Sequence, residues 1–536
     1  MSLLVQSLAL SASIASTDVQ PALDLVSRNF GIGATKALNL TINANLTTCA
    51  SPCFTVTQTE SNGAVSIVAT GISELTYGIG YYTRFSCGLT IGWEHGGGSH
   101  VVDWSTGGCH GPTVLQPIAM ERAVPYTYLD NVCTHSYSYA WYNENAWVKH
   151  IDWMALRGVN IFLAMTGQEE IQYKTFMKMG FNDIDIREFF NGPAYLTWSR
   201  GQSMQSVGSS ALPEGGSSGL PRSWMKAQWE LQKKILGLTR PLGIIGVLPA
   251  FQGNLPPQAK VMWPTANITN THHSRPAEEN QTKGDCSWLA STDPLFGRIA
   301  DVWMQTLLTD FGTDHWYQCD GFFTGAKPPW YAQSASDADH NTDTILPFDA
   351  PVQPDPQWTP VWKNAWQGMS RTDPKAKWLY QGWAIRGWRD VAGARRIKAL
   401  HDAVPQGQWI PLDMDINGIW KYWGNYSFFG APFIWTTLHN MGGNDGMKGD
   451  MRLLQQLPGA ALSAGASIIG VGGTPEGIDQ NPNYYEYAMD TAWHEKAQDL
   501  DAWFEGYAGW YARDSGNRYL HGYTHLYTHT RIYSSM

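Results

Sequence analysis

Acidic, amide and aromatic residues recur directly after short apolar runs along the middle of the chain. Carboxylates and amides form hydrogen bonds with hydroxyl groups, and an indole ring can stack on the apolar face of a sugar ring. Two carboxylates from different runs would be enough to cleave a glycosidic bond, about 5 Å apart for retention and further apart for inversion. The positions that follow the runs are Gln168, Glu169, Glu170, Gln252, Asn254, Asp320, Gln381, Trp383, Trp388, Asp413, Asp415, Asn417, His439 and Asn440.

Several of these carboxylates have structural explanations that compete with a catalytic one. Glu169 and Glu170 open a predicted helix, where capping and the helix dipole alone can account for at least one of them. Asp413 lies inside an apolar run and is expected to be a buried structural partner, and Asp320 could equally be a structural hydrogen-bonding group. Asp415 lies nearer the end of its run and is the better catalytic candidate.

The apolar runs have the length of strands and alternate with helical segments, in which apolar residues recur at helical spacing. Repeated β–α units of this kind imply parallel strands, and seven or eight of them predict a (β/α)8 TIM barrel over residues 127–449. In such a barrel the polar residues at the strand ends share one face. The expected strands fall in 158–165, 243–250, 316–323, 377–383, 408–415 and 432–439, with another expected in 131–139.

Two smaller regions are expected to flank the barrel. Residues 17–126 contain alternating runs rich in Thr, Val, Ile and Gly, which predict a small N-terminal α/β domain. Residues 450–536 are expected to form an α-helical C-terminal domain, truncated because the sequence stops without a helix cap. Residues 1–16 contain a short apolar run followed by small residues, as a secretory signal segment would, although a core strand is the alternative.

The composition excludes several classes of protein. Lys and Arg total 36 against 46 Asp and Glu, a net charge of −10, so a basic nucleic-acid binder is excluded. No apolar stretch is long enough to span a membrane. The 26 Trp exceed what a core alone would need and favour ring stacking. No zinc-type spacing, dinucleotide fingerprint or phosphate loop is present, so neither a metal nor another cofactor is expected.

Cysteines and glycosylation sequons point to the secretory route. Cys49 could pair with Cys53 and Cys87 with Cys109, and an odd total of seven leaves at least one thiol unpaired. Asn-x-Ser/Thr sequons occur at Asn39, Asn45, Asn267, Asn280 and Asn425.

Long ordered motifs carry a resemblance to a known family. They begin at Asn131 (NVCTHSYSY), Ile151 (IDWMALRGVN), Thr166 (TGQE), Phe189 (FFNGPAYLTW), Val247 (VLPAFQG), Phe311 (FGTDH), Gln381 (QGW), Pro432 (PFIW), Leu438 (LHNMGGN) and Thr474 (TPEGI). From about residue 70 to about residue 515 the chain resembles the lysosomal-type α-N-acetylglucosaminidases of glycoside hydrolase family 89.

That resemblance implies a small N-terminal α/β domain, a TIM barrel and a helical C-terminal domain. It also implies removal of terminal α-linked N-acetylglucosamine, notably from heparan sulfate, with retention of configuration and without a metal. By resemblance Asn131, Cys133, Trp198 and Trp383 would line the sugar pocket. The strand-end residues His439 and Asn440 are expected to bind the substrate as well.

The chain departs from the family at both catalytic positions. The family's acid/base is a glutamate in an Asp-Thr-Phe-Asn-Glu run, whereas this chain has Thr324 and Gly325 there. The family's nucleophile is a glutamate four residues after the Asp of Leu-Asp, and that position is Asn417 here. Neither substitute is an equivalent acid, and loss of a nucleophile or acid normally costs several orders of magnitude in rate.

Three interpretations therefore stay open. Other carboxylates could serve in a glycosidase, with Asp415 as nucleophile and Asp320 or Glu476 as acid. Alternatively, the chain could be a sugar-binding protein that does not hydrolyse its ligand. In the third interpretation the substrate's N-acetyl carbonyl acts as the nucleophile, but that geometry suits β-linkages rather than α-linkages.

Overall fold

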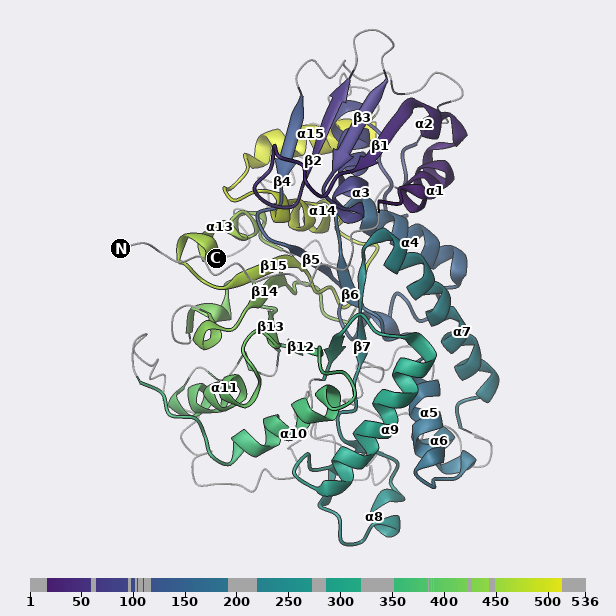
Figure 1. Cartoon of the computed structure of the whole chain (residues 1–536), viewed down its shortest axis with the longest axis vertical. Helices are drawn as coiled ribbons and strands as arrows, with labels where there is room; N and C mark the ends of the chain where they lie inside the picture. Colours follow the sequence, from purple (N-terminus) through teal and green to yellow (C-terminus); the bar gives the residue numbers. More distant parts are fainter. Residues whose placement is uncertain are drawn as a thin grey trace.

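Eight parallel strands form a closed barrel at the centre of the molecule (Figure 1). The computed structural model describes residues 17–58, 64–94, 98–101, 104, 109, 117–190, 219–271, 286–319, 351–383, 385–386, 388, 390–422, 427–442 and 449–512. The predicted TIM barrel is confirmed. Its strands are β5 (Tyr126–Leu129), β6 (Ile161–Leu163), β7 (Ile245–Pro249), β11 (Trp316–Gln318), β12 (Lys377–Gln381), β13 (Trp409–Asp413), β14 (Phe433–Thr437) and β15 (Ile468–Gly473).

Helices surround the barrel on the outside, as expected for strands that each lead into a crossover (Figure 1). Several begin at an Asn or Asp whose side chain accepts a backbone N–H of the first turn, such as Asn143, Asp293 and Asp390. The helices of this layer are α4 (Glu144–Leu156), α5 (Gln168–Lys178), α6 (Asp183–Phe189), α7 (Arg222–Thr239), α8 (Ala259–Met262), α9 (Pro294–Phe311), α10 (Trp358–Ser370) and α11 (Val391–Ala403).

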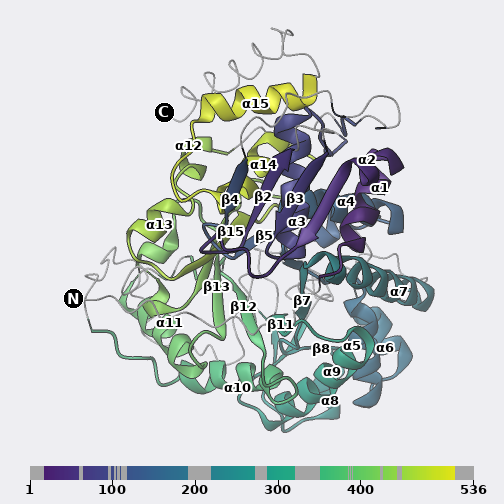
Figure 2. The same cartoon turned by 45° about the horizontal axis from the view of Figure 1, so that its top comes forward.

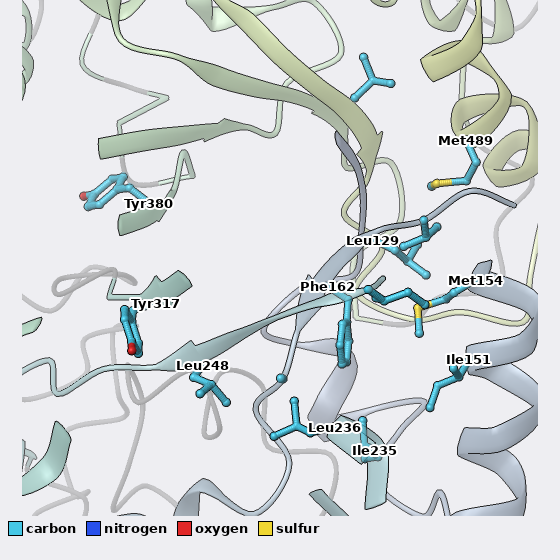
Figure 3. Close-up of a cluster of buried hydrophobic side chains, with 14 of the residues drawn as sticks. Leu129, Ile151, Met154, Phe162, Ile235, Leu236, Leu248, Tyr317, Tyr380 and Met489 are labelled. Carbon is cyan, nitrogen blue, oxygen red and sulfur yellow. The ribbon is translucent and has the colours of Figure 1, made fainter. Parts of the chain in front are cut away.

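Buried apolar side chains join the helices to the barrel. Figure 3 shows Ile151 of α4 and Ile235 of α7 among residues from the strands, including Leu129, Phe162 and Leu248. All five side chains are almost completely buried. Burial of large aliphatic and aromatic side chains contributes roughly 1.5–3 kcal/mol each, so this layer holds the strand ends in fixed positions.

A separate four-stranded sheet lies beside the barrel, together with α14 (Pro482–Asp490) and α15 (Leu500–Ala512) (Figure 2). The order β1-β3-β2-β4 and three helices agree with the expected N-terminal α/β region. Cys49–Cys53 and Cys87–Cys109 form the two disulfides that the sequence suggested. The elements are α1 (Gln20–Phe30), α2 (Ile32–Ala37), β1 (Leu38–Ile42), β2 (Cys53–Gln58), β3 (Val65–Ala69), α3 (Ile72–Tyr81) and β4 (Ile118–Glu121).

A small antiparallel sheet and two short helices complete the described elements. The sheet has the order β8-β10-β9. Among the described residues, no helix is long and apolar enough to cross a membrane. The remaining elements are β8 (Asn254–Leu255), β9 (Ile268–Thr271), β10 (Cys286–Leu289), α12 (Met451–Leu454) and α13 (Gly459–Ser463).

The expected strand in 131–139 is wrong. The strand of this barrel position is β5, which ends at Leu129, and residues 134–136 form a 3₁₀ turn. Side chains compete with strand pairing here, because Asn131 Oδ1 accepts the N–H of Cys133 at 3.0 Å and Thr134 Oγ1 accepts the N–H of Asn131 at 3.0 Å. Such local side-chain bonds stabilise a turn in place of an extended chain.

The expectation that the barrel ends at 449 and that 450–536 is helical is also wrong. β15 lies inside that range and pairs in parallel with both β14 and β5, so it closes the barrel. Its sequence, IIGVGG, has three glycines in six residues, which weakened the strand signal. The glycines are needed because a Cβ on Gly472 would overlap the backbone of Tyr128 in β5.

A buried ion pair ties the N-terminal elements to the C-terminal helices. Arg84, from the π-helix η1 (Tyr82–Ser86), donates two hydrogen bonds to Asp490 of α14, each of 3.0 Å. Tyr77 of α3 and Trp503 of α15 donate to the same carboxylate, each at 3.0 Å. Burial disfavours the ionised carboxylate, but Arg84 outweighs that effect and holds the pKa of Asp490 below its ordinary value.

Replacement of Gly472 by alanine should prevent normal closure of the barrel. The added methyl group meets backbone atoms of β5 that cannot move without breaking strand pairing, so we expect a loss of at least about 3 kcal/mol in the free energy of unfolding. Urea unfolding followed by circular dichroism measures this loss of stability. Gly509→Ala, on α15 with no atom within 4 Å of the new Cβ, is the matched control and should be neutral or slightly stabilising. Equal stabilities for both variants would contradict the role given to β15.

Candidate functional site

Glu476 and Asn440 fix the two loops that follow β15 and β14. The N–H of Glu476 donates to Asn440 Oδ1 at 2.8 Å, and Asn440 Nδ2 donates to the carbonyl of Gly477 at 2.7 Å. The carboxylate of Glu476 reaches back and accepts the N–H of Gly442. Each loop therefore holds the other, and the Glu476 side chain has a defined position at the carboxyl end of the barrel.

The loop after β5 joins this arrangement through Asn131 and Cys133. Asn131 Nδ2 donates to the carbonyl of Thr474 at 3.2 Å, while its Oδ1 accepts the N–H of Cys133. The Cys133 thiol forms a hydrogen bond with the carboxyl group of Glu476. The structure thus brings together Asn131, Cys133, Asn440 and Glu476, four residues that the sequence analysis selected from three separate segments.

Glu476 has the electrostatic environment of a proton donor. Burial raises the pKa of its carboxyl group above the ordinary value, and the hydrogen bonds from Gly442 and Cys133 only partly oppose this. A carboxylic acid with a raised pKa keeps its proton in a larger fraction of molecules at mildly acidic pH. The side chain is therefore suited to protonate a leaving group.

Asp413, the last residue of β13, organises the turn after its strand. Its two carboxylate oxygens accept the N–H groups of Asp415 at 3.0 Å and Trp420 at 2.9 Å. Burial raises the pKa of Asp413 to about 8, despite those backbone hydrogen bonds. The residue is fully buried, in agreement with the structural role expected from the sequence.

Asp415 lies two residues beyond β13, and donors from its own loop and from the loop after β12 hold its carboxylate. Arg386 Nε donates to Oδ2 at 3.2 Å, and the backbone N–H and the side-chain amide of Asn417 each donate to Oδ1 at 3.0 Å. Trp435 Nε1 donates to the Asp415 carbonyl at 3.0 Å. Asn417 therefore directs its side-chain amide to the carboxylate of Asp415.

Trp383 and His439 are both partly buried residues near the ends of their strands. The guanidinium of Arg386 lies over the Trp383 ring, 5.1 Å from its centroid, so a cation covers one face of the predicted sugar platform. His439 Nδ1 lies 3.1 Å from the Tyr485 hydroxyl, and its ring is 4.1 Å from that of Tyr484. Sequence reasoning missed Arg386 and Tyr485. Only the position of Arg386, three residues after Trp383, could have pointed to it.

Two of the predicted site residues, Asp320 and Trp198, lie outside the described residues. Glu170 forms a two-point ion pair with Arg222 of α7, in which Nη2 and Oε1 are 2.9 Å apart. That contact favours a structural role for Glu170. Within the described part of the chain, no group of three or more His, Cys, Asp or Glu side chains could hold a metal ion.

Comparison with known proteins decides the family. Residues 127–495 match the family model described as the α-N-acetylglucosaminidase (NAGLU) tim-barrel domain. Human α-N-acetylglucosaminidase is 31% identical over 498 residues, which cover 90% of this chain and 60% of the human protein. The chain belongs to the α-N-acetylglucosaminidase family. This family member spans less than two thirds of the length of that curated relative.

Solved structures of bacterial proteins share the fold of this α-N-acetylglucosaminidase family member. The family 89 glycoside hydrolase from Clostridium perfringens, bound to 2-acetamido-1,2-dideoxynojirimycin, has a TM-score of 0.76 and 23% identity, covering 94% of this chain and 51% of that chain. A form of the same bacterial enzyme in complex with its substrate GlcNAc-α-1,4-galactose has a TM-score of 0.77 and 22% identity, covering 95% and 52%.

The stability of this α-N-acetylglucosaminidase family member should depend on pH through Asp413. Its pKa is about 8 in the folded chain, against an ordinary value of 3.8. Between these values the folded state binds one more proton than the unfolded state, so stability falls as pH rises, by about 1.4 kcal/mol per pH unit. Asp413→Asn removes the titrating carboxyl group. It also replaces one of the two oxygen atoms that accept the N–H groups of Asp415 and Trp420.

Urea unfolding of the wild type and of Asp413→Asn between pH 5 and pH 8 tests this. The wild type should be the more stable protein at pH 5 and should lose that advantage steadily toward pH 8. Asp301→Asn, a partly exposed change on α9, serves as control for substitution of an Asp. A stability difference between wild type and Asp413→Asn that stays constant across the range would contradict the assignment.

Proposed function

We propose that this chain is a glycoside hydrolase that removes terminal α-linked N-acetylglucosamine from glycans such as heparan sulfate. Family membership supports the reaction class. The bacterial relative in complex with GlcNAc-α-1,4-galactose supports the linkage. The observation that carries the proposal is the pair of dissimilar carboxyl groups after β13 and β15. Asp415 is paired with a cation, whereas burial favours the protonated form of Glu476.

The two carboxyl groups would divide the reaction between them. A carboxylate oxygen of Asp415 attacks the anomeric carbon and displaces the glycosidic oxygen, which takes the proton of Glu476. A water molecule then hydrolyses the glycosyl ester, gives its proton back to Glu476 and releases the sugar with retained configuration. Asp320 is the alternative acid. Asp415 is one methylene shorter than the family's glutamate, so its backbone must lie closer to the sugar.

A second candidate function is sugar binding without hydrolysis. The resemblance places Asn417 at the position of the family's nucleophile, and one observation fits this reading: the backbone N–H and the side-chain amide of Asn417 both donate to Asp415. An Asn side chain cannot form a stable glycosyl ester. In this alternative, the amide and carboxylate groups at the strand ends serve only to bind hydroxyl groups.

Turnover of a chromogenic α-N-acetylglucosaminide at pH 4.5 separates the two functions. We expect Asp415→Asn to lower kcat/KM by at least about 10³-fold and Glu476→Gln by about 10²–10⁴-fold, because each removes a reacting group. Asp301→Asn and Glu230→Gln, on the outer helices, are the matched controls and should retain wild-type turnover.

Calorimetric binding of N-acetylglucosamine completes the test. Wild-type turnover no higher than that of Asp415→Asn, together with retained sugar binding, would exclude hydrolysis by Asp415 and favour the binding protein. Loss of turnover in Asp415→Asn with sugar binding retained supports the hydrolase.

We also propose that the protein follows the secretory route to a lysosome, a vacuole or the extracellular space and carries N-linked glycans. The two disulfides support an oxidising compartment. Asn39, Asn45 and Asn267 are exposed, as glycosylated residues must be, whereas Asn280 and Asn425 lie outside the described residues. A mass shift on treatment with an N-glycosidase would support this, and an unchanged mass after expression in a secreting host would contradict it.

A further inference from the structure

Arg386 occupies an unusual place for a cation in a chain of net charge −10. It follows β12 by five residues, on the barrel face where the loops of β13, β14 and β15 carry the candidate site. Its side chain is 47% exposed, whereas that of its partner Asp415 is only 8% exposed. The guanidinium thus lies at the boundary between solvent and a nearly buried carboxylate.

Two contacts fix the orientation of this guanidinium. Nε donates to Asp415 Oδ2 at 3.2 Å, and Cζ lies over the ring of Trp383, 5.1 Å from the centroid. Trp383 follows a buried strand and packs against the barrel interior, so it is a firm support. Arg386 therefore connects the loop after β12 to the carboxylate that follows β13.

The Asp415 carboxylate is held from two sides. Its Oδ1 is held from within its own loop by Asn417, whereas Arg386 is the partner of Oδ2 that comes from a different strand. Hydrogen bonds from two directions fix the orientation of a carboxylate. A displacement of a reacting group by about 1 Å can lower the rate about 10²-fold.

We propose that Arg386, seated on Trp383, is a positioning residue that holds the Asp415 carboxylate in its working orientation toward the sugar. This inference rests on the proposed function, because it assigns a partner to the carboxylate that the function uses. It gives Trp383 a role as support for the cation.

Substitution of Arg386 should impair function while leaving the fold intact. Because the Arg386 side chain is 47% exposed and Asp415 keeps the two N–H donors of Asn417, Arg386→Gln should unfold at nearly the same urea concentration as the wild type. We expect its kcat/KM on the chromogenic α-N-acetylglucosaminide to fall by about 100-fold. Arg386→Lys should keep part of the activity, because it retains the charge but not the planar donor group.

Guanidinium rescue provides a readout that a purely structural role would not move. Added guanidinium ion, below denaturing concentration, should restore activity to Arg386→Ala and not to Asp415→Asn. Arg371→Gln is the matched control, since Arg371 is comparably exposed and pairs with Asp301 on the outer helices, away from the candidate site, and should behave as wild type. Equal activity of Arg386→Gln and Arg371→Gln, or loss of activity that neither guanidinium nor lysine repairs, would overturn the inference.

Failure of the proposed function is distinguishable from failure of this inference. If the wild type itself shows no turnover, the hydrolase proposal fails, and calorimetric affinity for N-acetylglucosamine becomes the readout. A positioned Asp415 then predicts about tenfold weaker binding by Arg386→Gln, restored by guanidinium in Arg386→Ala. Unchanged affinity in Arg386→Gln would overturn the positioning role.

Discussion

Parallel pairing of β15 between β14 and β5 is the constraint on which the rest of the structure depends. It closes the barrel and places the chain that follows Gly473 beside the loops of both neighbouring strands. Asn131 then reaches the carbonyl of Thr474, and Asn440 clamps the backbone at Glu476. Without closure Asn131 and Thr474, 343 residues apart in the chain, would have no reason to meet. The glycines of β15 make the close approach possible.

A second constraint holds the frame around the barrel. Asp490 follows the site loops through α14 and receives Arg84 from the N-terminal elements, with both side chains buried. A buried charge left without its partner costs several kcal/mol, so the N-terminal sheet, the barrel and the C-terminal helices should unfold together. Many of the tryptophans fill the packed core of the molecule. Trp153, Trp303 and Trp435, for example, are fully buried.

Some strands and site residues could be predicted from the sequence and others could not, depending on the kind of sequence signal that each one leaves. Strands such as β7 and β12 were predictable because continuous apolar runs need burial on both faces. β15 was not, since its glycines serve backbone contacts that only the assembled barrel contains. Asp415 and Glu476 could be selected by type and place. The clamp from Asn440 and the cation at Arg386 could not, because both depend on distances between loops of different strands.

The central claim is that one sugar site uses the carboxyl groups of Asp415 and Glu476 together. The most direct measurement is a crystal structure of the wild-type protein with N-acetylglucosamine bound. We expect both carboxyl groups to contact the sugar and to lie about 5 Å apart, as retention requires. A sugar bound away from either group, or a separation beyond about 10 Å, would contradict it.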